Sequence, residues 1–226
     1  MCGRIHVKEN AFIQLLLEEL FVDNPLQMRY HAFRKPCDEL SIVTQVQGKR
    51  MLTPATWWLL LDETEQGFKA SRYTSFNTRS DKLHQAGSAG YIPFKASRCI
   101  IPATGFGETQ ALKGQQSIYH DLTAKQRAIA FAGLSRQWQH SRTGEIVHSC
   151  SIITNAPHIK LAQIHTKASP AMLLPHEYDD WLDCGRNSYK LNAVLTPRIT
   201  QDFMAQRIIK PSDNRPVGES FTINSD

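Results

Sequence analysis

The chain has 226 residues, 41% of them hydrophobic, and a formal net charge of +5 from 26 lysines and arginines against 21 acidic residues. This length and composition are typical of a globular protein with a substantial core, and the positive balance weakly favours a polyanionic partner. No apolar stretch is long enough to span a bilayer, and the start lacks the apolar core of a signal peptide. We therefore expect one domain over residues 1–226, soluble, cytoplasmic and not associated with a membrane.

The cysteines argue against two common kinds of site. They are odd in number and widely scattered, and the chain contains no CxxC pair and no HExxH motif. This pattern indicates neither a disulfide framework nor a zinc site, and it fits a reducing compartment. The cysteines are Cys2, Cys37, Cys99, Cys150 and Cys184.

Hydrophobic periodicity and turn residues predict a mixture of strands and short helices. In the first half, the predicted elements are a strand at Arg4–Val7, a helix from Ala11 to about Phe21 capped by Asn10, strands at Leu40–Val46 and Thr56–Leu61, a functional loop from Asp62 to Tyr91, and a strand at Arg98–Ala103. In the second half, they are strands at Ser117–Leu122, Ala128–Leu134 and Ile146–Thr154, turns at Lys113–Gly114 and Thr143–Gly144, a short helix starting at Asn155, and a helix from Pro175 to about Asp183. We expect those last three strands to form one central antiparallel meander, and the segment from about residue 211 to be a loosely held tail.

The chain starts with Met1, Cys2, Gly3 and Arg4. Methionine before so small a residue is readily removed, which would leave Cys2 with a free α-amine next to its thiol. Their reference pKa values, about 7.7 to 8.0 and about 8.5, leave both groups partly deprotonated near neutral pH. An aldehyde can form a Schiff base with such an amine, and the sulfur can then close a thiazolidine ring. The alternative is that Cys2 is an ordinary residue of a frayed terminus.

Three further positions carry side chains suited to polar chemistry. Asn77 supplies donors and an acceptor, and Arg79 supplies a planar fork that can hold a phosphate. Two glycines around Phe106 predict a tight turn that aims Glu108 away from the strand end, where burial in a cleft would raise its pKa. His165 titrates in a range that suits proton transfer, although a lone histidine is more often structural.

Two adjacent tryptophans, Trp57 and Trp58, lie within the predicted strand Thr56–Leu61. We expect both to pack in the interior, but an exposed indole could also stack on a nucleobase.

The order of these motifs resembles the SOS-response-associated peptidase (SRAP) family, whose members shield abasic sites in single-stranded DNA. The resemblance spans most of the chain. It comprises Cys2-Gly3-Arg4, Phe76-Asn77-Thr78-Arg79, the run from Arg98 to Ala103, Gly105-Phe106-Gly107-Glu108, Ala132-Gly133-Leu134, Ile152-Ile153-Thr154 and Ile164-His165. The chain departs from the family pattern at His31, Trp58, Asp81, Thr109 and the segment after His165, which reads Thr166-Lys167-Ala168-Ser169-Pro170.

The resemblance implies an α+β fold with a strongly curved, barrel-like antiparallel sheet and flanking helices. It also implies that Cys2, Asn77, Glu108 and His165 are catalytic. Glu108 would protonate the ring oxygen of the abasic sugar, His165 would assist proton transfer, and Asn77 would hold the amine and the sugar. Arg4 and Arg79 would grip flanking phosphates, with Trp57 and Trp58 as further DNA-binding candidates.

The expected activity is crosslinking of the aldehyde of abasic single-stranded DNA, with lyase-like chemistry, by a monomer that needs no metal or organic cofactor. A cysteine-type, autoproteolytic peptidase activity is a second implication of the resemblance.

Two other functions remain open. A class II glutamine amidotransferase-like amidohydrolase also begins with cysteine and glycine, but such domains use an Asn-Gly pair that this chain lacks. A non-covalent single-stranded DNA-binding module would bind reversibly through its basic and aromatic residues. Release of ammonia from glutamine would support the first alternative, and reversible binding without a denaturation-resistant adduct would support the second.

Overall fold

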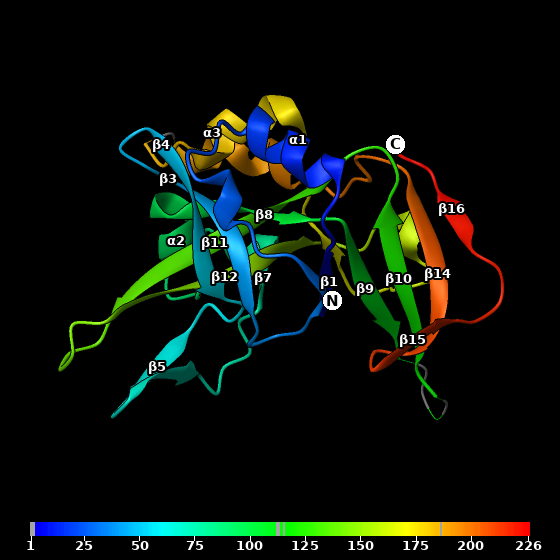
Figure 1. Cartoon of the computed structure of the whole chain (residues 1–226), viewed down its shortest axis with the longest axis horizontal. Helices are drawn as coiled ribbons and strands as arrows, with labels where there is room; N and C mark the ends of the chain where they lie inside the picture. The colour runs from blue at the N-terminus through cyan, green and yellow to red at the C-terminus, as the bar shows by residue number, and fades with distance from the viewer. Residues whose placement is uncertain (1–2, 112–113, 115, 186) are drawn as a thin grey trace.

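Two curved, mainly antiparallel sheets face each other and make up most of the chain in this computed structural model (Figure 1). The structure describes residues 3–111, 114, 116–185 and 187–226. A few short helices lie outside the sheets, and α1 and α3 cover one end of the molecule. The predicted α+β class with a strongly curved, barrel-like sheet is therefore confirmed.

The first sheet contains the N-terminal strand and the C-terminal strands. Its order is β15, β14, β10, β9, β1 and β2, and β16 pairs with β14. The bounds are β1 Arg4–Val7, β2 His31–Arg34, β9 Gly105–Gln110, β10 Ile118–Ala124, β14 Phe203–Lys210, β15 Asp213–Pro216 and β16 Phe221–Ile223. In Figure 1, β1 lies near the middle of the molecule, with β9, β10 and β14 to one side of it.

The second sheet has the order β11, β8, β3, β4, β12 and β13, with β7 paired in parallel to β12. The bounds are β3 Glu39–Val46, β4 Lys49–Thr56, β7 Asn77–Arg79, β8 Arg98–Ala103, β11 Ile129–Gln139, β12 Ile146–Asn155 and β13 Ser169–Pro170. Because β7 runs beside β12, the residues of the Asn77–Arg79 motif lie level with Ile152–Thr154.

Helices are few and short in the described residues. The α-helices are α1 Ala11–Glu19, α2 Tyr91–Ala96 and α3 Tyr178–Leu182, and short 3-10 helices occur at Pro25–Gln27, Ser80–Lys82, Ile159–Leu161, Pro175–Glu177 and Ser188–Leu195. Helix α1 begins where predicted because the side chain of Asn10 accepts a hydrogen bond from the backbone N–H of Ile13, 3.1 Å away. Its apolar stripe of Ile13, Leu16 and Leu17 is buried, as its helical spacing predicts.

Aromatic packing joins the two sheets. The ring of Phe106 on β9 is fully buried and makes edge-to-face contacts with Phe131 on β11 and Phe203 on β14, each with ring centroids 5.7 Å apart. Aromatic rings prefer this geometry, which adds to the burial of their surface. Phe106 therefore fixes β9, the strand that carries Glu108, against the core.

The predicted single meander is wrong. Strand β10 pairs with β9 and β14 in the first sheet, whereas β11 pairs with β8 and β12 in the second, so the chain changes sheet between Ala124 and Ile129. The predicted turn at Thr143–Gly144 is confirmed, and Gly144 has a φ of 72°, a left-handed conformation that favours glycine. Lys113, in the other predicted turn, lies outside the described residues.

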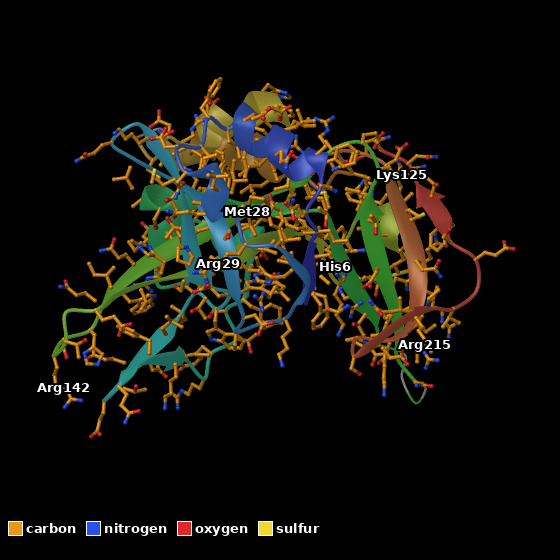
Figure 2. All side chains as sticks on the ribbon, viewed as in Figure 1. His6, Met28, Arg29, Lys125, Arg142 and Arg215 are labelled. Atoms are coloured by element: carbon orange, nitrogen blue, oxygen red, sulfur yellow. The ribbon has the colours of Figure 1, made fainter. Side chains whose placement is uncertain are left out.

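Part of the predicted functional loop is a hairpin. Strands β5 (Leu61–Thr64) and β6 (Gly67–Ala70) pair with each other, and the strand predicted at Thr56–Leu61 is instead the end of β4 and the link to β5. The hairpin packs on the loop that joins β11 to β12. Arg142 at that loop donates to the Glu65 carbonyl at 2.7 Å, and the two tips project together from the body (Figure 2).

The expected loosely held tail is wrong as well. Strand β16 pairs with β14, and Ile223 is 4% exposed. The carboxylate of Asp226 accepts a hydrogen bond from the backbone N–H of Ile199 at 2.7 Å and forms an ion pair with Lys160 at 2.8 Å. A polar composition suggested a tail, but the alternation of Phe221 and Ile223 with polar residues is the pattern of an edge strand.

One buried arginine holds two helices to the second sheet. Arg98 on β8 is 1% exposed, and its guanidinium donates to the carbonyls of Phe94 and Trp181, each at 2.7 Å, and of Asp183. These acceptors lie at the C-terminal ends of α2 and α3, where carbonyls lack intrahelical partners. Arg98 satisfies them while the indole of Trp181 donates to the Cys99 carbonyl at 2.8 Å.

We expect Arg98→Met to lower the free energy of unfolding by about 3 kcal/mol, because three buried carbonyls lose a charged donor while the aliphatic volume is kept. Urea denaturation followed by tryptophan fluorescence measures this. Arg127→Met is the control, since Arg127 is exposed and should tolerate the change within about 0.5 kcal/mol. Equal stabilities of the two variants would show that Arg98 does not anchor the helices.

Candidate active site

Glu108 lies on a regular strand and not on the tight turn predicted from its two glycines. Gly105 and Gly107 belong to β9, which pairs with β1 on one side and β10 on the other. Neither glycine is among those with positive φ. Glycine is needed at 107 for a different reason, because a Cβ there would lie 2.2 Å from Nε of Arg4.

The carboxyl group of Glu108 faces the interior. Successive strand residues point to opposite faces, so Glu108 shares the face of the core residue Phe106. Glu108 is 1% exposed, and this burial raises its pKa to about 7, against the opposing effect of the positive charge of Arg4. A carboxyl group in this state is partly protonated near neutral pH, which suits a general acid.

His165 is the nearest titratable partner of Glu108 in the described chain. Its Nδ1 lies 3.6 Å from a carboxylate oxygen of Glu108 and 2.9 Å from the backbone carbonyl of Thr109. A carbonyl can only accept, so Nδ1 carries the proton and the neutral ring has its lone pair on Nε2. Burial lowers the pKa of His165, and the charge of Lys167 lowers it further, so a neutral ring is favoured at neutral pH.

Arg4 is held inside the protein and does not have the exposure that a phosphate contact requires. It pairs with Gly107, so its side chain lies on the face of the sheet opposite to Glu108. It is 4% exposed, and its guanidinium donates to the carboxylate of Asp121 at 3.2 Å, the Glu108 carbonyl at 3.2 Å and the His120 carbonyl at 3.0 Å. The assignment of Arg4 as a phosphate contact is corrected to a role in positioning β9.

A histidine on β1 extends this network. Nδ1 of His6 lies 2.6 Å from the Ala32 carbonyl, and its Nε2 lies 3.3 Å from the same Asp121 oxygen that Arg4 contacts. Each ring nitrogen of His6 therefore faces an acceptor oxygen, so the ring links β1 to both β2 and β10. His6 lies at the centre of the molecule in Figure 2.

Asn77 and Arg79 approach from the second sheet. They occupy one face of β7, while Thr78 between them is buried and shares a 2.8 Å hydrogen bond with Ser151. Asn77 is half-buried, and Arg79 is exposed. The guanidinium of Arg79 makes a two-point contact with Asp81, at 2.9 and 2.6 Å, which lowers the pKa of that carboxyl group.

The two tryptophans differ. Trp57 is fully buried and donates to the Phe76 carbonyl at 2.8 Å, so it has no exposed face on which a base could stack. Its assignment as a DNA-binding residue is therefore corrected to a core role. Trp58 is half-buried, donates to the Ser71 carbonyl at 3.1 Å, and keeps the prediction of a base contact open.

The structure thus brings together Glu108 and His165, whereas Asn77 and Arg79 come from the other sheet. Cys2 lies outside the described residues. Sequence reasoning did not assign a role to Lys167, which follows His165 by two residues and lines one cavity with Arg79. The sequence signal that could have identified Lys167 as a site residue was its position two residues after the candidate catalytic His165.

In the described part of the chain, no group of three or more His, Cys, Asp or Glu side chains is placed to hold a metal ion. Within the same residues, no helix is long and apolar enough to cross a membrane.

The raised pKa of Glu108 makes a prediction about stability. A carboxyl group with a folded-state pKa of about 7 stabilises the fold fully below its unfolded value, about 4.3, and this contribution is lost as the pH rises through 7. The loss amounts to about 4 kcal/mol, since a difference of one pKa unit corresponds to about 1.4 kcal/mol. We therefore expect Glu108→Gln to be more stable than the wild type at pH 8, with the advantage shrinking towards pH 4.5.

Thermal unfolding across pH 4.5 to 8 measures this difference, with the exposed Glu18→Gln as the control. A Glu108→Gln difference that does not depend on pH would show that the carboxyl group ionises normally.

Solved structures of other proteins are similar to this chain in fold. A Bacteroides thetaiotaomicron protein superposes with a TM-score of 0.74 at 21% identity, covering 94% of this chain and 97% of that one, and a Bordetella bronchiseptica protein with 0.70 at 17%, covering 92% and 100%. These two likenesses show the fold.

Curated relatives are similar over most of the sequence. Abasic site processing protein YoaM of Bacillus subtilis is 25% identical over 214 residues, covering 92% of this chain and 91% of the relative, and YoqW of the same species is 26% identical over 224 residues, covering 96% and 97%. Abasic site processing protein HMCES of Xenopus tropicalis is 26% identical over 182 residues, covering 72% of this chain and 52% of its own length. The family model described as SOS response associated peptidase (SRAP) matches residues 1–212, and the chain belongs to this family.

Proposed function

We propose that this protein processes abasic sites in single-stranded DNA by forming a covalent crosslink between Cys2 and the sugar aldehyde. The main support is the buried pair of Glu108 and His165, a carboxyl group with a pKa of about 7 beside a neutral imidazole. Relatives that cover most of the chain carry the name abasic site processing protein, which supplies the substrate class.

Chain connectivity limits where the nucleophile can act. Two residues span at most about 7 Å, so the Cα of Cys2 lies within that distance of the Cα of Arg4. Arg4 pairs with Gly107 and donates to the backbone carbonyl of Glu108. Arg4 is therefore fixed next to the strand that carries the acid, and in our proposal a nucleophile joined to it through two residues reacts in an intramolecular step.

The reaction has three balanced steps. Glu108 gives a proton to the ring oxygen of the closed abasic sugar as the hydroxyl at C1′ loses its proton, which opens the ring to the aldehyde. The α-amine of Cys2 then adds to the aldehyde carbon, and loss of water gives the imine. Finally the thiol adds across the imine, with sulfur bonding to carbon and the proton passing to nitrogen, which closes the thiazolidine.

The remaining residues have supporting roles. Nε2 of His165 can accept and return the protons that the carbinolamine gains and loses, because its lone pair is not used by the Thr109 contact. Asn77 orients the amine and the sugar. Arg79 binds a neighbouring phosphate, which replaces Asp81 as the partner of its guanidinium group. The crosslink shields the abasic strand from cleavage. Removal of a residue before Cys2 would be the peptidase activity of the same site.

A denaturing gel tests the covalent step. The wild type should form a heat-resistant adduct with abasic single-stranded DNA and none with the intact strand. Cys2→Ala retains an α-amine after methionine removal, so it should give an imine that borohydride traps but no heat-resistant product. Mass spectrometry of the starting proteins confirms that Met1 is absent.

The matched control carries one extra, unremovable residue before Cys2, which turns its nitrogen into an amide. It should form neither product. If Cys2→Ala traps no more DNA than this control, the amine does not attack first. If the wild type releases ammonia from glutamine and forms no adduct, the amidohydrolase alternative is supported.

The phosphate contact of Arg79 makes a separate prediction. A plot of the logarithm of the binding constant for intact single-stranded DNA against the logarithm of the salt concentration should have a slope of about −0.7 per phosphate neutralised. Arg79→Ala should make this slope shallower by about 0.7, because one phosphate contact is lost. Asp81→Asn should increase affinity, because the guanidinium no longer has an internal partner.

Lys125→Ala is the control for charge alone. Lys125, which Figure 2 labels, follows the last residue of β10, whereas His120, which pairs with Glu108, lies near the first. Fluorescence anisotropy measures the affinity of the wild type and of the three variants for DNA at each salt concentration. Identical slopes for Arg79→Ala and Lys125→Ala would mean that Arg79 contacts no phosphate.

A further inference from the structure

A cavity lies beside the candidate active site, with a volume of about 560 Å³. This volume is within the range of small-ligand sites, about 300 to 1,000 Å³. The cavity is lined by Arg79, Thr154, Asn155, Lys167, Leu195 and Pro197, among others. Arg79 follows Asn77 by two residues on the same face of β7, and Lys167 follows His165 by two residues in the segment before β13, so the cavity adjoins both of these candidate residues.

Polar and apolar groups are unevenly distributed around it. Ala156, Pro157, Ala168, Leu195 and Pro197 supply apolar lining. The charged lining residues Arg79, Asp81 and Lys167 are all exposed, and the two cations outnumber the one carboxylate, which is paired with Arg79. A ligand that fits this pattern has an apolar body and an anionic group attached to it.

Two lining side chains have unused hydrogen-bonding groups. Thr154 is 2% exposed and Asn155 is 5% exposed. Within the described residues, neither the hydroxyl of Thr154 nor the amide oxygen of Asn155 has a hydrogen-bond partner. Buried polar atoms are almost always paired, so such atoms beside a cavity indicate a partner that enters it.

We propose that this cavity holds the nucleobase of the nucleotide next to the abasic residue, and that Asn155 contacts the edge of that base. This inference rests on the proposed function, because it takes the strand to be fixed at Cys2. A base has apolar faces for the alanine, leucine and proline side chains and a polar edge for an amide. Its phosphate lies where Arg79 and Lys167 can reach it.

An asparagine suits this task because its amide offers a donor and an acceptor side by side, the pairing that base edges use. The χ2 angle of asparagine has a broad distribution, so rotation about it can turn either the amide oxygen or the amide nitrogen towards the base. The site therefore selects bases with an adjacent donor and acceptor, and it contributes to both binding and the placement of the abasic sugar.

The test compares abasic oligonucleotides in which one neighbour is either a normal nucleotide or a base-free tetrahydrofuran spacer, on the 5′ side in one series and the 3′ side in the other. On one of the two sides, removing the base should slow adduct formation by the wild type about tenfold, which corresponds to about 1.4 kcal/mol. Equal rates for all substrates would overturn the inference while leaving the crosslinking function intact.

Two variants link the effect to the cavity. Asn155→Leu keeps the size of the side chain but removes its polar atoms, and Ala156→Phe fills the cavity from an exposed position. Both should react with the normal and the base-free substrate at nearly equal rates. Asn224→Leu and Ala86→Phe, at exposed positions that do not line the cavity, should keep the tenfold ratio.

The rate ratio separates recognition from a structural role, because a merely destabilised protein loses rate on both substrates alike. Anisotropy with the same spacer in a strand without an abasic aldehyde gives a second measurement. If no protein forms an adduct but the base-dependent affinity persists and is lost in Ala156→Phe, the proposed function fails and the base site stands. If that affinity is also unaffected by Ala156→Phe, the base site fails.

Discussion

The burial of one carboxyl group is the constraint on which this site depends. Transferring a charged carboxylate out of water is unfavourable, so burial raises the pKa of Glu108 and favours its neutral form. The position is fixed because β9 is paired on both sides and Phe106 holds it against the core. A site built on strands is more precise than one built on a loop. The same burial that weakens the fold at neutral pH therefore keeps a proton on Glu108, as the proposed reaction requires.

The position of Glu108 depends in turn on the far face of its sheet. Arg4 crosses over Gly107, where only glycine leaves room, and contacts the carboxylate of Asp121 and the carbonyl of Glu108. His6 contacts the same carboxylate. This network ties β1, β9 and β10 together through the buried guanidinium of Arg4 and the largely buried carboxylate of Asp121, so each of them needs its partner. Loss of one partner would leave an unpaired buried charge in the sheet that carries Glu108.

Much of the fold followed from local patterns. The apolar stripe of α1 and the strands β1 and β3 depend on residues that are close in sequence, and they were predicted correctly. The assignment of β10 and β11 to different sheets depends on long-range pairing, which periodicity does not contain. Likewise, the spacing of Gly105 and Gly107 suggested a turn, whereas the structure uses the absence of a side chain at 107 to admit Arg4. A glycine pattern shows where space is needed and not what fills it.

The site residues show the same division. The residue types at Asn77, Glu108 and His165 indicated chemistry, but only the fold separates an exposed Arg79 from a buried Arg4. Both were candidates for phosphate, and both are arginines near a motif. Asp121 sits across the sheet from Arg4 and was invisible to sequence spacing, whereas Asp81 is two residues from Arg79. An ion pair that is local and exposed can exchange its carboxylate for a phosphate in water. A buried pair with several partners cannot, because each donor would lose its acceptor at once. Burial thus divides two similar arginines into one that positions the acid and one that can meet the substrate.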